Sequence, residues 1–201
     1  MANTQAQFGF QQFGYLPGGA VDYQMSNAVI LSTYSTLIGN GDPVMKTNAT
    51  SPYIIQATGS LATTAPIMGI FVGCMFQPSG GGAPTWSPYW PGAAAANATA
   101  YIINAPNALF KVATLQTAVN STMIGWVANF TTGSPTTTGG GFSVATIDEA
   151  TATNTGTTAS MMPFKIVSLY PGIGNGSDPT TNYNWIIVTF NNQTYKMLSG
   201  F

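Results

Sequence analysis

Few side chains in this 201-residue sequence could perform acid–base or nucleophilic chemistry. The sequence has no histidine, and it has a single cysteine, Cys74. Without an imidazole there is no Ser-His-Asp or Cys-His arrangement and no histidine metal ligand, and one cysteine cannot form an internal disulfide or a Cys-x-x-Cys motif. The remaining candidates are the five acidic residues: Asp22, Asp42, Asp148, Glu149 and Asp178.

These acidic residues do not follow a catalytic pattern. Asp42 and Asp178 each precede a proline, as is common in turns. Asp148 and Glu149 are adjacent, so on a strand they would face opposite ways, and in a loop they would form a solvated pair. A glycosidase with two carboxylates from distant parts of the chain stays open, but no spacing favours it. We predict that the protein is not an enzyme and uses no cofactor.

The glycine-rich and Asn/Asp-rich segments are better explained as loops than as ligand sites. Asn175 and Asp178 in GNGSDP have oxygen atoms suited to a cation, but hydrogen bonds within a turn account for the same residues, so no metal site is predicted. Gly80–Gly82 and Gly139–Gly141 precede neither a Lys-Ser/Thr pair nor a helix start. We therefore expect flexible loops there rather than phosphate-binding loops.

Charge is scarce throughout the sequence. Charged residues make up 4% of the chain, with four lysines, no arginine and a net charge of −1. Nucleic-acid binding needs Lys or Arg to neutralise phosphates, so we predict that the chain does not bind DNA or RNA directly. Hydrophobic residues reach 45%, enough for a packed core. Since little repulsion separates copies of such a chain, we expect its surface to be largely covered by neighbouring chains.

The sequence shows no membrane or export signal. No basic segment followed by an apolar segment occurs near the first residue, so no secretory signal is predicted. The longest apolar run, Ile67–Phe76, is too short to cross a bilayer, so no membrane partner is expected. Cys74 lies within this run and is expected to be a buried, unreactive thiol.

Short runs of β-branched and aromatic residues, separated by Gly, Pro and Asn, predict an all-β protein. The expected strands cover residues 28–31, 44–46, 53–56, 67–76, 101–103, 108–112, 164–170 and 185–190. Residues 104–107 are expected to connect two of these strands as a hairpin, and residues 191–193 to lead into a final strand over 194–198. Since βαβ alternation is missing, the pattern favours an antiparallel barrel or sandwich.

The helical signal is weak. From Leu115 to Phe130, apolar residues recur every three or four positions, which predicts at most one short helix within residues 114–130. The region is rich in Thr and Ser and contains Gly125, all of which have low helix propensity, so a strand over residues 123–130 is the alternative to a helix. Residues 133–141 and 151–160 have low complexity and are expected to be exposed, mobile loops.

The first 26 residues predict an extended N-terminal arm, followed by a β-rich domain of residues 27–201. Aromatic residues alternate with Gln and Gly in this arm: Phe8, Phe10, Phe13 and Tyr15. Because these rings have little to pack on locally, we expect them to be ordered against the chain's own domain or against another subunit. They are the candidate capsid or subunit contacts considered below.

A second aromatic group lies in the sequence TWSPYWPG, which contains Trp86, Tyr89 and Trp90. Pro88 and Pro91 favour extended geometry in the residues before them, so the stretch is interpreted as a stiff corner. The three rings are predicted to anchor the core or a subunit interface, and stacking on a sugar is the alternative.

Several segments together resemble a family of tailed-bacteriophage head proteins that are interpreted as decoration or cement proteins. They are the N-terminal MAN-x-x-x-x-FGF-x-x-FG pattern, GDPV, GIFVGC, WSPYWPG, PNALF and VTFNNQTYK. The resemblance implies a structural virion protein, made in the host cytoplasm, that binds the outer surface of an icosahedral head and stabilises it against DNA pressure. It also implies the major capsid protein as partner and a homo-oligomer, with a trimer favoured over a dimer.

Two other roles compete with this expectation. A receptor- or carbohydrate-binding module of a head or tail fibre would fit exposed Trp and Tyr beside Asn-rich loops. A major capsid protein is disfavoured because the chain is short and lacks a long predicted helix.

Overall fold

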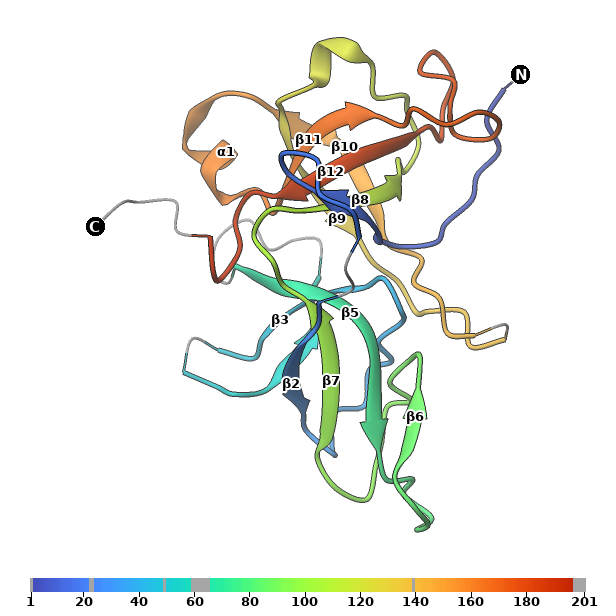
Figure 1. Cartoon of the computed structure of the whole chain (residues 1–201), viewed down its shortest axis with the longest axis vertical. Coiled ribbons are helices and arrows are strands. Elements are labelled where there is room, and N and C mark those ends of the chain that lie inside the picture. Colours follow the sequence, from blue (N-terminus) through green and yellow to red (C-terminus); the bar gives the residue numbers. More distant parts are fainter. Residues whose placement is uncertain (1, 22–23, 49, 59–65, 139, 197–201) are drawn as a thin grey trace.

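The structure is a computed structural model of the chain and describes residues 2–21, 24–48, 50–58, 66–138 and 140–196. Strands make up 42% and helix 4%, and the strands form two antiparallel sheets that do not close into a barrel. The prediction of an all-β, sandwich-like protein is therefore confirmed. Figure 1 shows sheet A in the upper half of the molecule and sheet B in the lower half.

Sheet A has the strand order β1-β8-β12-β11-β9-β10. Its strands are β1 (Gln11–Tyr15), β8 (Ala108–Ala113), β12 (Trp185–Phe190), β11 (Phe164–Leu169), β9 (Val127–Thr131) and β10 (Thr146–Thr153). In β8 the buried positions include Ala108, Phe110 and Val112, which share one face because side chains alternate along a strand. This face covers the core.

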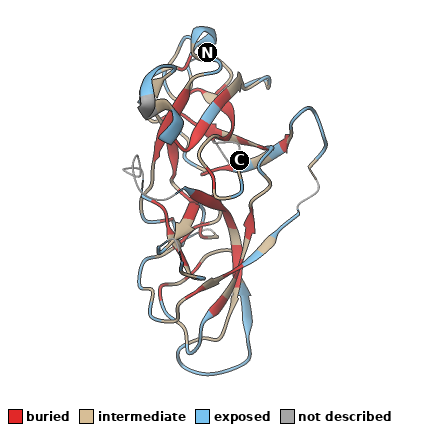
Figure 2. Ribbon diagram, turned by 90° about the vertical axis from the view of Figure 1, so that its left-hand side faces the viewer, coloured by how far each residue is buried: buried red, intermediate tan, exposed pale blue. Residues whose placement is uncertain are grey.

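Sheet B has the order β2-β7-β5-β3-β4, with β6 paired to β5. Its strands are β2 (Ser26–Ile30), β7 (Ala98–Ile103), β5 (Ile67–Phe76), β3 (Pro43–Lys46), β4 (Ile54–Gln56) and β6 (Thr85–Ser87). The central strand β5 is buried along most of its length (Figure 2), which explains its almost continuous apolar sequence. Cys74 on β5 is buried as expected, and burial raises the pKa of its thiol to about 12.

The core consists of two hydrophobic clusters, of which the first contains residues of both sheets. In the first, Phe10 stacks on Phe164 with ring centroids 4.3 Å apart, and other phenylalanines of sheet A pack around them. Ile67, Ile70 and Ile103 of sheet B belong to this same cluster, which joins the sheets. The second cluster consists of side chains from the strands of sheet B, together with Ile38 and Trp90.

Two predicted hairpins are wrong. Residues 101–103 lie in β7 of sheet B and residues 108–112 in β8 of sheet A, so the connection between them crosses from one sheet to the other. After β12 the chain turns toward sheet B instead of pairing back on β12: Gln193 bridges Ile67 in parallel, and the Thr194 N–H donates to the Ile67 carbonyl. Part of the predicted strand, residues 197–198, lies outside the described residues.

The helix expected within residues 114–130 is also wrong. This region holds a single 3₁₀ turn, Ser121–Met123, started by Asn120, whose side chain accepts the Thr122 N–H, and then β9. The short α-helix, α1 (Gly156–Met161), instead follows β10 and overlaps residues 151–160, which were expected to be a loop. The strand alternative for residues 123–130 was partly right, because β9 begins at Val127.

Candidate functional site

A buried polar cluster surrounds Asp42, in the turn before β3. The Asp42 carboxylate is fully buried and accepts three hydrogen bonds: from the Gly39 N–H at 2.7 Å, from Gln56 Nε2 at 2.8 Å and from Ser143 Oγ at 2.5 Å. Gln56 ends β4, whereas Ser143 leads toward β10 in the other sheet. One carboxylate therefore ties together segments of both sheets.

The N-terminal segment packs directly on this turn. The Phe10 N–H donates to the Gly41 carbonyl at 2.9 Å. Gly9 has φ +69°, and a Cβ at its position would lie 2.5 Å from the Ser143 Cβ, so the close approach requires glycine. Sequence reasoning treated Asp42 as an ordinary turn residue, and no local signal distinguishes it, because Gln56 and Ser143 are distant in the chain.

Burial raises the pKa of Asp42 to about 6, although the hydrogen bonds from Ser143, Gly39 and Gln56 favour its charged form. Tyr34 is the other titratable group nearby: its hydroxyl accepts the Gln56 N–H, and burial raises its pKa as well. A carboxyl whose pKa is higher in the folded than in the unfolded protein stabilises the fold most below its unfolded pKa of 3.8. That contribution is lost as the pH rises through about 6.

This shift predicts a pH-dependent stability. Two pKa units correspond to about 3 kcal/mol, so the free energy of unfolding should fall by about that amount between pH 4 and pH 7. In Asp42→Asn, which cannot ionise, this part of the pH dependence should disappear, as measured by urea unfolding at several pH values. Asp178→Asn, at an exposed carboxyl, is the matched control and should keep the wild-type profile. Parallel profiles for wild type and Asp42→Asn would contradict the assignment.

Asp148 and Glu149 lie on a strand, so the predicted strand alternative, with the two side chains on opposite faces, holds, and the loop alternative of a solvated pair does not. Glu149 lies on β10, is buried, and accepts the backbone N–H groups of Leu115, Gln116 and Thr117. Asp148, its neighbour, is half-buried on the opposite face of the strand, as the alternation of strand side chains requires. Glu149 thus fixes the chain that leaves β8. The local sequence does not reveal this role, because the N–H groups of residues 115–117 are distant from Glu149 in the chain.

The Asn175 and Asp178 side chains are occupied by hydrogen bonds. Asp178 accepts the Thr180 N–H at 2.9 Å, which is the turn that the sequence predicted. Asn175 exchanges two hydrogen bonds with the backbone of Thr4, so it holds the N-terminal segment. Among the residues that the structure describes, no group of three or more His, Cys, Asp or Glu could hold a metal ion.

The predicted arm is integrated into sheet A. Residues 11–15 form the edge strand β1, and Phe10 is enclosed in the core, where it cannot contact another chain. Tyr15 is half-buried, whereas Phe13 is 42% exposed. Phe13 is thus the one of the four predicted contact residues that β1 turns clearly outward.

Phe8 belongs to an aromatic cage around a lysine. The Lys111 Nζ lies 5.0 Å from the ring centre of Phe8, 4.8 Å from that of Trp185 and 5.6 Å from that of Tyr170. Burial lowers the pKa of Lys111. The cation–π contacts attach the start of the chain to β8 and β12.

The three rings of TWSPYWPG separate in the structure. Trp90 is fully buried in sheet B, and its Nε1 donates to the Tyr34 carbonyl at 2.9 Å. Tyr89 packs on Gly141, where a Cβ would overlap its ring. Trp86, on β6, is 53% exposed. The stretch therefore presents no platform of three rings, and Trp90 is a core anchor.

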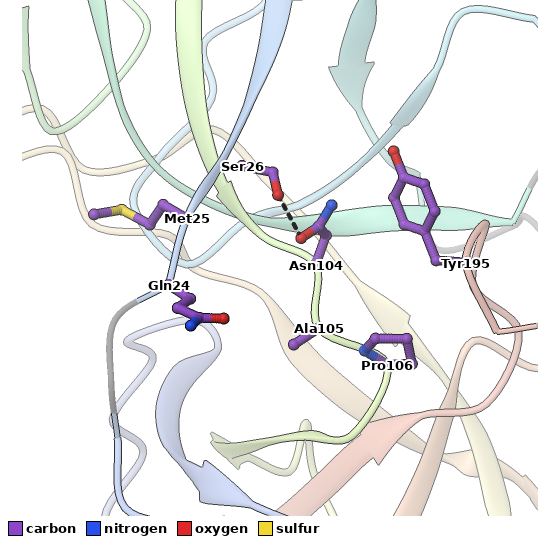
Figure 3. A pocket seen from close by; sticks show the side chains of 7 residues that line it. All are labelled: Gln24, Met25, Ser26, Asn104, Ala105, Pro106 and Tyr195. Carbon is purple, nitrogen blue, oxygen red and sulfur yellow. Dashed lines mark hydrogen bonds between the residues drawn. The ribbon is translucent and has the colours of Figure 1, made fainter.

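Two of the cavities in the described part of the chain adjoin at Met25. The first, of about 380 Å³, lies where the start of β2, the connection from β7 to β8 and the C-terminal segment meet (Figure 3). The second, of about 340 Å³, extends along β1 and β5. We call these two cavities, which share Met25 as a lining residue, the groove between the sheets. The sequence does not reveal it, because its walls come from six separate segments: residues 10–12, 24–26, 40, 70–72, 103–106 and 195. The first cavity is lined by Gln24, Met25, Ser26, Asn104, Ala105, Pro106 and Tyr195.

Comparison of the chain with models of protein families, with curated proteins and with solved structures found no match. The fold and the side chains therefore define the class by themselves: a two-sheet, all-β protein with few charges, whose buried carboxylates hold chain segments in place. No helix in the described residues is long and apolar enough to span a membrane.

Proposed function

We propose that this chain is a structural virion protein of the decoration type, which binds the outer surface of an icosahedral bacteriophage head and stabilises it against internal DNA pressure. Its partner would be the major capsid protein, and it would act as a homo-oligomer, with a trimer favoured over a dimer. The proposal begins from the sequence resemblance. The structural observation that supports it most is the outward face of the N-terminal segment.

That face is apolar and lies at a sheet edge. Phe13 on β1 is 42% exposed, and Leu16, which follows β1, is 40% exposed. β1 is the edge strand of sheet A, and the backbone at its end is already paired: the Tyr15 N–H donates to the Gly19 carbonyl and the Leu16 N–H to the Asn107 carbonyl. The register of β1 against β8 shifts between Gln12 and Gly14, an irregularity that opposes pairing with a further strand, so the proposed contact is made by the exposed side chains. Coverage by a neighbouring chain would remove this surface from water.

The same segment is firmly attached on its inner side. Phe10 stacks in the core, Phe8 contacts Lys111, and Asn175 binds Thr4. The outward residues therefore form a preordered contact surface rather than a free arm. Preordering lowers the entropy lost on binding, and many weak contacts on a symmetric shell would add through avidity.

The proposal predicts that Phe13→Ser combined with Leu16→Ser weakens binding to heads that lack the protein by about tenfold or more, because it removes exposed contact side chains. Co-sedimentation with purified heads measures this effect, and the melting temperature should stay close to that of wild type. Ile173→Ser, at a fully exposed residue of another loop, is the matched control. Deleting residues 1–16 would be a poorer test, because it also removes Phe10 and β1.

Unchanged binding by the double variant would refute the contact surface. Failure of the wild-type protein to bind heads, combined with tight binding to host cells, would instead favour a receptor-binding module. Cryo-electron microscopy of the particle distinguishes the two roles directly, because a decoration protein occupies the outside of the head, and a fibre module occupies a tail or a vertex.

A further inference from the structure

We propose that the groove between the sheets binds a neutral saccharide. This inference goes beyond the proposed function and does not depend on it. Cavities of roughly 300–1,000 Å³ that combine apolar walls with a few oriented polar groups are typical of small-ligand sites. Each of the two adjoining cavities exceeds the lower bound, at about 380 and 340 Å³.

The walls of the groove exclude a charged ligand. Among the described residues, the side chains that line the two cavities are all uncharged. Lys196, next to Tyr195 in sequence, donates its Nζ to the Phe190 carbonyl instead. The described walls offer a phosphate or a carboxylate no cation and offer a metal ion no carboxylate, so a neutral ligand fits them best.

The amide side chains offer both donors and acceptors. Ser26 Oγ donates to Asn104 Oδ1 at 2.8 Å, which fixes the carboxamide and leaves its Nδ2 at the other end, on the side of Tyr195 (Figure 3). In the second cavity, Gln12 donates its Nε2 to the Tyr15 hydroxyl, while its buried Oε1 has no partner within the described residues. Hydroxyl groups both donate and accept, so adjacent sugar hydroxyls can satisfy an amide N–H and an amide oxygen.

The apolar surface of the groove complements the carbon face of a sugar ring. The Tyr195 ring is 52% exposed and stands opposite Asn104 across the first cavity (Figure 3), and Met25 is 47% exposed where the two cavities meet. A tyrosine ring packs its apolar face on a ligand while its hydroxyl stays in a polar environment. The aromatic residue for sugar stacking is therefore Tyr195 and not a residue of TWSPYWPG.

The experiment applies the full-length chain to an array of neutral oligosaccharides of glucose, galactose, mannose and N-acetylglucosamine. Calorimetry with the strongest binder then compares the variants. Tyr195→Ala removes the stacking surface. Asn104→Asp keeps the oxygen that accepts from Ser26 but replaces the amide donor. Both should weaken binding about tenfold or more, whereas Trp86→Ala, at an exposed aromatic residue outside the groove, should bind within about twofold of wild type.

Three outcomes would overturn the proposal: no neutral saccharide bound at about 10 mM, equal losses in Trp86→Ala and Tyr195→Ala, or a preference for peptides of a capsid protein over sugars. Binding to heads is measured in parallel with Tyr195→Ala. Normal binding to heads together with lost sugar binding separates this site from the proposed function, so each can fail without the other.

Discussion

Trp90→Ala is expected to cost about 3–5 kcal/mol of the free energy of unfolding, the usual range for removing a buried tryptophan. The indole is fully buried in the core of sheet B, packs edge-on against Phe76, and donates to the Tyr34 carbonyl. The substitution leaves both a cavity and an unpaired carbonyl. Thermal unfolding followed by circular dichroism should show a melting temperature about 10 °C lower, by the usual scaling for a chain of this size.

Trp86→Ala provides a matched control from the same eight-residue stretch. Its indole is more than half exposed on β6, so removing it should change the free energy of unfolding by less than about 1 kcal/mol. Equal losses from the two variants would contradict the assignment of Trp90 as the anchor. A stable Trp90→Ala protein with impaired binding to a ligand would restore the interpretation of TWSPYWPG as a binding site.

Phe10→Ala should have an effect of similar size, about 3–5 kcal/mol. Phe10 stacks on Phe164 and makes edge contacts with Phe110 and Phe130, so it connects the N-terminal segment to three strands of the aromatic core, β11, β8 and β9. Its loss should also loosen β1, because the ring that anchors the chain directly before that strand is removed. Urea unfolding measures the first effect, and hydrogen exchange of the β1 amides measures the second.

Phe13→Ala, three residues away on β1, separates the two faces of this segment. Phe13 is exposed and meets Tyr170 only edge-on, with ring centroids 6.5 Å apart, so the expected loss is below about 1 kcal/mol. If Phe10→Ala were as mild as Phe13→Ala, the N-terminal segment would be an exchangeable arm rather than part of sheet A. The proposed contact surface on β1 would then have to be reconsidered.

The sequence established the all-β class and most strand positions. β-branched and aromatic runs bounded by Gly, Pro and Asn predicted β5 and β12 to the residue, because strand formation depends mainly on local side-chain shape and turn chemistry. Charge scarcity and the lack of histidine are likewise properties of the sequence alone. These features limit the chemistry available to the protein without locating any site.

The sheet to which each strand belongs was decided by the tertiary structure. The connection through Asn104–Asn107 has the residues of a hairpin turn, yet β7 and β8 lie in different sheets. Turn chemistry allows a change of direction but does not select the partner strand, which depends on contacts far apart in the chain. The groove, which is lined in part by this connection, could not be foreseen for the same reason.

Burial of individual side chains was decided in the same way. In the sequence Asp42 resembles a solvent-exposed turn residue, but in the fold its carboxylate is enclosed by Gln56 and Ser143 from other segments. Trp86 and Trp90 likewise differ in burial although they lie four positions apart. By itself, the sequence determined which residues form strands, because backbone and side-chain preferences act locally. Only the tertiary structure decided which polar groups are enclosed and which rings face water, because enclosure requires atoms from other parts of the chain.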